Sequence, residues 1–239
     1  MQAMPLRRST AAVLAAVALS AALVAGCSTS SSNQQSGAPL PDAATLLKQS
    51  AQTTRDLKSA HLDLTVQGKI AGLPLQSLTG DLTNVPAVAA KGHTRLMLAG
   101  DAAEADFVVL DGTLFGSLDP NSWNNFGPAS DIYDVSVILN PDTGLANILS
   151  NFTDPKADGR ETVSGVQTIK ITGQVSADAV NKIAPKVATG GTVPGTAWIR
   201  EDGNHDLVQA KLEPSSGNSI QMTLSKWNDP VTVEKPPGV

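Results

Sequence analysis

Apolar and polar residues alternate with a period of two over much of the chain. In residues 61–67, Leu62, Leu64 and Val66 alternate with polar neighbours. Similar alternation returns in residues 77–82, 92–98, 104–110, 168–173, 196–201, 207–214 and 218–227. Side chains of a strand point alternately to its two faces, so these segments predict a long antiparallel sheet with one face in water.

The phase of each strand assigns its side chains to a face. The charged and polar members predict a water-facing set: His93, Arg95, Lys170, Arg200, Gln209, Lys211, Glu213, Gln221 and Ser225. The apolar members predict an inward-facing set: Leu64, Val66, Leu96, Leu98, Ile169, Ile171, Ala197, Ile199, Val208, Ala210, Leu212, Ile220, Met222 and Leu224.

Three segments have helical spacing instead. Residues 42–58 begin with Asp42, a capping residue, and residues 176–185 are bounded by Ser176 and Pro185. In residues 140–152, Asn140 and Pro141 predict an N-cap and first helical residue, followed by one apolar stripe. That stripe consists of Leu145, Ile148, Leu149 and Phe152. The pattern predicts an α+β protein with helices on one face of the sheet.

The N-terminus predicts export. Arg7 and Arg8 precede an apolar stretch at residues 11–26, which is shorter than the ~20 residues that cross a membrane comfortably. The only cysteine, Cys27, directly follows the sequence LVAG, which resembles a bacterial lipobox. That resemblance implies cleavage before Cys27 and its lipidation, whereas the alternative is an ordinary secretory signal with an incidental cysteine. We expect a signal peptide at 1–26, lipidated Cys27 with a Ser-rich tether at 27–41, and one domain at 42–239.

The cysteine count, the net charge and the aromatic content limit which kinds of core and partner the protein can have. A single cysteine allows no internal disulfide, so stability must come from a core. Loss of the signal, which carries two arginines and no acid, changes the net charge from −5 to −7 and argues against a nucleic-acid partner. Aromatic residues make up only 3% of the chain, and a curled sheet lined by such modest side chains can leave a cavity. Composition alone favours the alternative, an ordinary close-packed core.

Motifs for catalysis or cofactor binding are absent from the sequence. His61, His93 and His205 are widely separated and form no metal-ligand pattern, and there is no serine-nucleophile or phosphate-binding motif. Residues 202–206 resemble part of a calcium loop, but a hairpin turn explains them better. Residues 116–131 could hold a sugar or lipid headgroup, or form a polar loop anchored by Trp123 and Phe126. We expect neither an enzyme nor a metal, and no cofactor.

Several segments together resemble the mycobacterial LppX/LprG lipoprotein family. They are residues 40–82, 105–118, 123–134, 138–152 and 217–227, in matching order, together with the lipobox. The resemblance implies a curved antiparallel β half-barrel with helices over the concave face, enclosing a large apolar lipid-binding cavity. It also implies binding of triacylated lipids such as phosphatidylinositol mannosides, lipomannan, lipoarabinomannan and triacylglycerol.

The family's role further implies transport of these lipids from the cytoplasmic membrane toward the outer envelope, in partnership with a major-facilitator membrane transporter. The lipid-anchored protein would lie in the cell envelope, on the outer face of the cytoplasmic membrane. A fraction of it could be released from that membrane. Two other classes stay open: a surface scaffold or receptor acting through a protein partner, and an envelope hydrolase, for which no motif is present.

Strand phase and the resemblance together predict the cavity wall. In residues 92–98, His93 and Arg95 must face water, which turns Thr94 inward. The predicted lining is Leu64, Val66, Thr94, Leu96, Leu98, Phe107, Val109, Leu145, Ile148, Leu149, Phe152, Ala210, Leu212 and Met222. Gly112, Gly116, Gly127 and Gly144 are candidate flexible points for opening it, although ordinary turns also require glycine.

Overall fold

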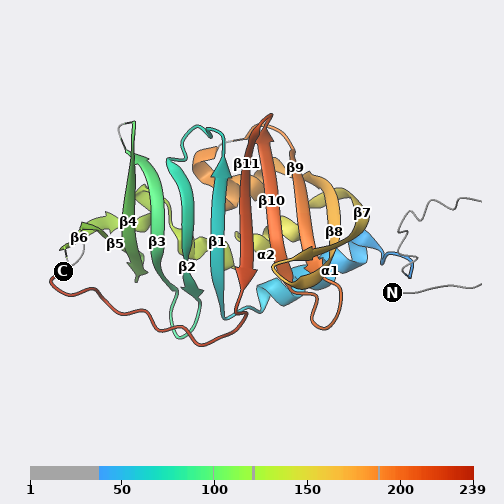
Figure 1. Ribbon diagram of the computed structural model, residues 1–239, viewed down its shortest axis with the longest axis horizontal. Coiled ribbons are helices and arrows are strands. Elements are labelled where there is room, and N and C mark those ends of the chain that lie inside the picture. Colours follow the sequence, from blue (N-terminus) through green and yellow to red (C-terminus); the bar gives the residue numbers. More distant parts are fainter. Residues whose placement is uncertain (1–37, 99, 120–121, 188) are drawn as a thin grey trace, which may run out of the picture. The chain divides into compact units, whose positions relative to one another are not determined.

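The computed structural model describes residues 38–98, 100–119, 122–187 and 189–239 (Figure 1). Within it, residues 39–239 form one compact unit. The predicted signal peptide, the lipidated Cys27 and the tether as far as residue 37 lie outside the described residues, so these expectations stay predictions.

Eleven strands form one antiparallel sheet that is not closed into a barrel. Their order is β6-β5-β4-β3-β2-β1-β11-β10-β9-β8-β7, so β6 and β7 are its two edges (Figure 1). The strands are β1 (Ser59–Gln67), β2 (Leu75–Thr83), β3 (Ala89–Leu98), β4 (Asp101–Leu110), β5 (Thr113–Asp119), β6 (Ser122–Pro128), β7 (Phe152–Val163), β8 (Val166–Val175), β9 (Val193–Arg200), β10 (Leu207–Ser215) and β11 (Asn218–Ser225). The predicted α+β half-barrel class is confirmed.

Register confirms that the alternating apolar residues share a face. Leu64 in β1 pairs with Leu78 in β2 and Met222 in β11, and the same row continues through Thr94 on one side and Ala210 on the other. All five are buried. The row therefore runs across the inner face from β3 to β10.

One predicted inward residue lies elsewhere. A bulge between Leu207 and Gln209 pairs Leu207 with Ile199 and Gln209 with Trp198. Leu207 consequently enters the main core cluster, whereas Val208 is buried outside it. The prediction for Val208 was wrong because the bulge adds one residue to the alternation.

All helical segments lie behind the sheet in Figure 1, on its inner face. They are α1 (Ala43–Arg55), η1 (Ala129–Asp131), η2 (Val135–Leu139), α2 (Leu145–Ser150), α3 (Ala177–Ile183) and η3 (Pro185–Val187). Asp42 caps α1 by accepting a hydrogen bond from Thr45 N at 2.8 Å, and Ser176 caps α3 by accepting one from Ala179 N at 3.2 Å. Both predicted caps are confirmed.

The predicted helix start at Asn140–Pro141 was wrong. Asn140 Oδ1 accepts hydrogen bonds from the backbone N–H groups of Asp142 and Thr143, which closes a turn instead. The helix α2 begins only at Leu145. Phe152, assigned to the same helical stripe, is the first residue of β7.

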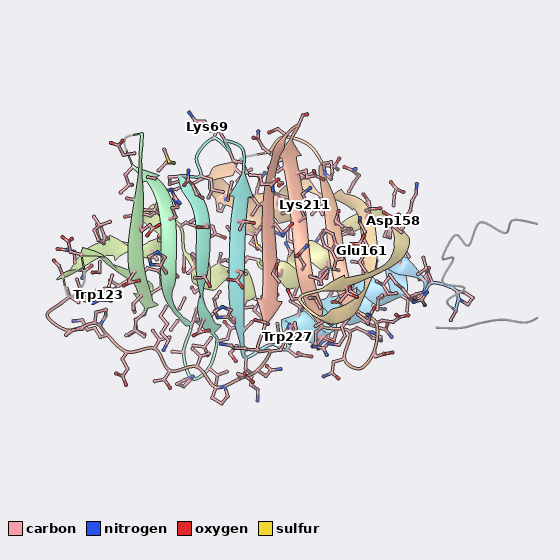
Figure 2. All side chains as sticks on the ribbon, viewed as in Figure 1. Lys69, Trp123, Asp158, Glu161, Lys211 and Trp227 are labelled. Carbon is pink, nitrogen blue, oxygen red and sulfur yellow. The ribbon has the colours of Figure 1, made fainter. Side chains whose placement is uncertain are left out.

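The outer face of the sheet around β7–β10 carries charged side chains. Lys211 and Glu161 lie on it in Figure 2, on the side of the sheet away from the helices. The carboxylate of Glu161 accepts hydrogen bonds from Trp198 Nε1 at 2.6 Å and Lys170 Nζ at 3.0 Å. These two donors hold the pKa of Glu161 below its usual value. The water-facing assignment of Lys170 and Lys211 agrees with this arrangement.

The C-terminal segment after β11 returns past the lower ends of β1 to β4 toward β5 (Figure 1). Asn228 N donates to Ser59 O at 2.9 Å, and Lys91 Nζ donates to Thr232 O at 2.7 Å. Lys235 Nζ lies 5.8 Å from the ring centre of Phe115. Phe115 and its strand neighbour Val108 are buried, yet both lie outside the main core cluster. The segment therefore helps to cover an apolar patch on the outer face.

Deleting residues 232–239 should lower the free energy of unfolding by about 1–3 kcal/mol, because Phe115 and Val108 lose cover. Urea denaturation followed by circular dichroism measures this. Deleting only residues 238–239 is the control and should change little. An unchanged midpoint for the longer deletion would mean that the segment does not bury this patch.

Candidate functional site

An apolar cavity of about 200 Å³ lies between strands β2–β6 and the segment that carries η1 and η2. Its wall comes from residues of every one of these strands and from the turn before β2. The lining is Leu73, Pro74, Leu75, Leu78, Thr94, Leu96, Leu98, Ala105, Asp106, Phe107, Val109, Leu114, Gly116, Ser117, Leu118, Phe126, Ile132, Tyr133 and Val135.

The few polar groups in this wall are already engaged. Thr94 Oγ1 donates to Ser77 O at 3.0 Å, and Ser117 Oγ donates to Asp119 O at 2.5 Å. Asp106 Oδ1 lies 3.0 Å from His93 Nδ1 on the neighbouring strand. With these groups engaged by protein atoms, the cavity offers a surface suited to hydrocarbon.

Tyr133 joins the cover of the cavity to α3. Its hydroxyl donates a hydrogen bond to Ile183 O at 3.3 Å, and its ring packs against the core cluster. Burial, with a smaller contribution from Asp134, raises the pKa of Tyr133 well above its usual 10.0. The phenol is therefore a neutral hydrogen-bond donor at physiological pH.

This raised pKa predicts a loss of stability in alkali. Above about pH 10 the unfolded chain releases the phenol proton while the folded chain retains it, so the free energy of unfolding falls as pH rises. Tyr133→Phe should remove that part of the pH dependence and cost about 1 kcal/mol near pH 7, the usual value of one hydrogen bond. Urea titrations at pH 7 and at several values above 10 compare the two proteins. Identical alkaline slopes would contradict the assignment.

Exposed apolar side chains surround the mouth of the cavity. Leu98, Leu118, Phe126 and Ile132 all line it and are 44%, 57%, 49% and 41% exposed. They come from β3, β5, β6 and the residue after η1. Four separate segments thus bring large apolar groups to one edge, which we call the rim.

Five of the predicted lining residues border this cavity: Thr94, Leu96, Leu98, Phe107 and Val109. The other nine lie outside its lining: Leu64, Val66, Leu145, Ile148, Leu149, Phe152, Ala210, Leu212 and Met222. Most of these nine are buried in the core cluster, and Val66 and Phe152 pack against it. That any of the fourteen contacts a lipid stays a prediction.

Helices and side chains fill the space under the other half of the sheet. α1 packs against α2 and lies over β7 and β9, and α2 in turn contacts α3. A Cβ atom added at Gly173 or Gly195 would come within 3.0 Å of the Phe152 ring, so this ring lies directly on two adjacent strands. The two alternatives from the sequence therefore each describe one half, a packed half near β7–β10 and a hollow half near β2–β6.

Several lining residues were missed from the sequence, among them Leu114, Phe126 and Tyr133. In β5, Leu114, Gly116 and Leu118 lie on the inner face, but the outward Phe115 is also apolar, so the segment shows no clear alternation that could have revealed the strand. The segment considered as a polar loop instead contains the end of β5, all of β6 and η1. β6 carries both Phe126 and Trp123, which is labelled in Figure 2.

The glycines proposed as flexible points have different surroundings. A Cβ atom at Gly116 would come within 2.8 Å of the Phe126 ring, and one at Gly144 would meet the carbonyl oxygens of Val137, Ile138 and Asn140. Both glycines are needed for close packing. Gly112 and Gly127 have positive φ angles of 72° and 81° and open surroundings, as turn residues do.

Two larger surface hollows have a different character. One, of about 390 Å³, lies between α1 and the start of β7 and includes Lys48, Gln52 and Arg55; the other, of about 470 Å³, adjoins the β9–β10 turn. Both are more open and have mixed polar and apolar walls, which suits water better than hydrocarbon.

In the described part of the chain, no group of three or more metal-ligating side chains occurs and no helix is long and apolar enough to cross a bilayer. His61 Nδ1 lies 2.6 Å from Asp81 Oδ1, a strand-to-strand pair. Residues 202–206 form the β9–β10 turn, as expected, where Arg200 N donates to Asp206 O at 2.9 Å.

The protein thus combines an open antiparallel half-barrel, helices on its inner face and an apolar cavity under one half. A class of lipoproteins shares this fold. The family model LppX_LprAFG lipoprotein matches residues 42–233. The protein belongs to this family.

Relatives of known name are similar to this protein over nearly its whole length. The chain is 57% identical over 226 residues to the lipoarabinomannan carrier protein LprG of Mycobacterium tuberculosis, covering 95% of this chain and 94% of that one. It is 56% identical over 238 residues to LprG of Mycolicibacterium smegmatis, covering 99% of both. These relatives confirm the expected similarity to LprG.

Crystal structures of two family members share the fold. LprF of Mycobacterium bovis has a TM-score of 0.76 at 29% identity, covering 84% of this chain and 100% of that one. LppX of Mycobacterium tuberculosis has a TM-score of 0.63 at 31% identity, covering 80% and 97%.

Proposed function

We propose that this protein carries triacylated glycolipids through the cell envelope and holds acyl chain in the cavity under β2–β6. The observation that carries the proposal is the cavity wall, which combines aliphatic and aromatic side chains with polar groups that already have protein partners. Each methylene moved from water into such a cavity contributes ~0.8 kcal/mol. Affinity for acyl chains can therefore arise without specific hydrogen bonds to the lipid.

The proposed identity of the bound lipid is inferred from the names of the relatives. Proteins 57% and 56% identical to this chain are named lipoarabinomannan carriers. Lipoarabinomannan is therefore the first proposed ligand. Lipomannan, phosphatidylinositol mannosides and triacylglycerol are proposed with it, as the resemblance stated from the sequence implies. Their sugar headgroups would stay outside the mouth, while the acyl chains enter.

The volume of the cavity sets a condition on binding. An apolar cavity of ~150 Å³ accepts a molecule the size of benzene, so about 200 Å³ accepts only a short part of one acyl chain. Binding of two or three chains therefore requires the cavity to enlarge. The cover around Ile132 and Tyr133 is the proposed moving part, because no regular strand ladder holds it to β2–β5.

The location and partners are proposed with the function. Lipidated Cys27 would anchor the protein on the outer face of the cytoplasmic membrane, and a major-facilitator transporter would act with it. Lipids would move from that membrane toward the outer envelope. No enzymatic step is part of this proposal.

Native mass spectrometry tests the proposal on a form that starts at Ser28, produced in a host that makes mannosylated and triacylated lipids. We expect discrete bound masses that extraction resolves into lipids with two or three chains. A clean protein mass, with no uptake of added lipid, would overturn the proposal and favour a scaffold or receptor.

A further inference from the structure

The rim has a composition that the cavity alone does not require. Four large apolar side chains at the mouth of the cavity are exposed: Leu98, Leu118, Phe126 and Ile132. An apolar cavity needs apolar walls, but it does not need large apolar groups at its mouth that are 41% to 57% exposed to water. Their exposure implies that something apolar covers them during part of the protein's work.

We propose that the rim is a docking surface for a lipid bilayer. This inference rests on the proposed function, because a carrier must transfer acyl chains without exposing them to water. With the rim seated in the interfacial region, bilayer and cavity would form one continuous apolar path. Apolar side chains of bilayer-bound surfaces enter about 5–10 Å into the boundary between headgroups and acyl chains.

A bilayer fits the rim better than a protein partner does. A stable protein interface takes about 800 Å² from each partner, or some 20–30 residues. Four partly exposed side chains from separate elements fall far short of that, and a bilayer accepts apolar side chains individually without a matching shape. The rim is also continuous with the cavity, since all four of its residues line both.

The charges beside the rim define the kind of bilayer surface. Asp119 follows Leu118 directly, and Asp131 precedes Ile132, and both acids are exposed. One cation lies beside these acids, because Lys186 Nζ donates to the backbone oxygen of Asp131 at 2.5 Å. The rim therefore has no excess of positive charge, and its attraction to a bilayer is apolar, without a requirement for anionic lipid.

Flotation with phosphatidylcholine vesicles tests this inference on the form that starts at Ser28, since the compact unit 39–239 contains every described helix and strand. The rim variant Leu118→Ser/Ile132→Ser should bind at least about tenfold more weakly. The matched control is Val85→Ser/Val88→Ser, which changes two side chains that are 50% and 48% exposed and lie outside the cavity lining. It should bind like the unchanged protein.

A second measurement does not depend on the rim variant folding. The form that starts at Ser28 has no cysteine, so Leu118→Cys and Val88→Cys can each carry one environment-sensitive NBD dye. Vesicles should shift the emission of the dye at position 118 to the blue and leave the dye at position 88 unchanged.

Three results would overturn the inference: no binding of the unchanged protein to phosphatidylcholine, equal binding of the rim variant, or equal dye shifts at both positions. Binding that appears only with anionic lipid and persists in the rim variant would assign it to basic groups elsewhere, and so also overturns it. Lipid loading in native mass spectrometry with failed vesicle binding would refute docking alone, whereas failed loading would refute the proposed function.

Discussion

Replacing Thr94 with Trp should abolish lipid loading while the protein stays folded. Thr94 is buried, and it borders the cavity from the middle of β3. An indole there occupies a large part of about 200 Å³ that acyl chain would otherwise enter. We expect bound lipid to fall at least tenfold in native mass spectrometry. The free energy of unfolding should change by only about 1–2 kcal/mol, mainly from the lost hydrogen bond to Ser77 O.

Ala210→Trp is the matched control for this result. Ala210 lies in the same row across the sheet, but it pairs with Met222 and Ala197 in the packed half and does not border the cavity. Overpacking there should cost about 3 kcal/mol, the upper end of its usual range, or prevent folding. Unchanged loading in a folded Thr94→Trp protein would show that lipid does not enter this cavity.

Gly144→Ala should destabilise the protein by about 2–4 kcal/mol, because the turn between η2 and α2 has no room for a methyl group. A Cβ atom there would lie 2.6 Å from Val137 O and 2.7 Å from Asn140 O, and closer still to Ile138 O. Since Ile138 and Leu145 on either side are fully buried, the strain reaches the core that supports the cavity's cover.

Urea denaturation measures this loss. Gly190→Ala is the control, because no atom lies within 4 Å of the added Cβ and the expected change is within about 0.5 kcal/mol. Equal midpoints for the two variants would mean that the turn relaxes at no cost, and that Gly144 is as adaptable as a hinge requires.

Alternation in the sequence was sufficient to place the strands that have one buried and one wet face. It failed for the two edge strands, since most residues of β6 and β7 are exposed or half-exposed. β7 even contains Pro155, which an edge strand tolerates because one side of its backbone needs no partner. Such strands are held by backbone pairing to a neighbour and leave no apolar pattern to recognise.

The cavity could not be located from the sequence for a different reason. Leu64 and Leu96 have the same strand phase and similar side chains, yet only Leu96 borders the cavity. What distinguishes them is the packing of other elements over the sheet, such as η2 against β2 and β3, which the alternation within one strand does not encode. Residues 113–119 could not be recognised as a strand either, because the outward Phe115 is apolar and the inward Gly116 has no side chain, so the segment does not alternate.

Photo-crosslinking tests the central claim, that acyl chain occupies this cavity, most directly. The probe is a triacylated phosphatidylinositol mannoside with a diazirine in one acyl chain, irradiated after loading and mapped by peptide mass spectrometry. We predict crosslinks in β3, β4 and β5 and at Tyr133, and their loss in Thr94→Trp. Crosslinks confined to α1, α2 or β8–β10 would contradict the account and place the lipid under the packed half of the sheet.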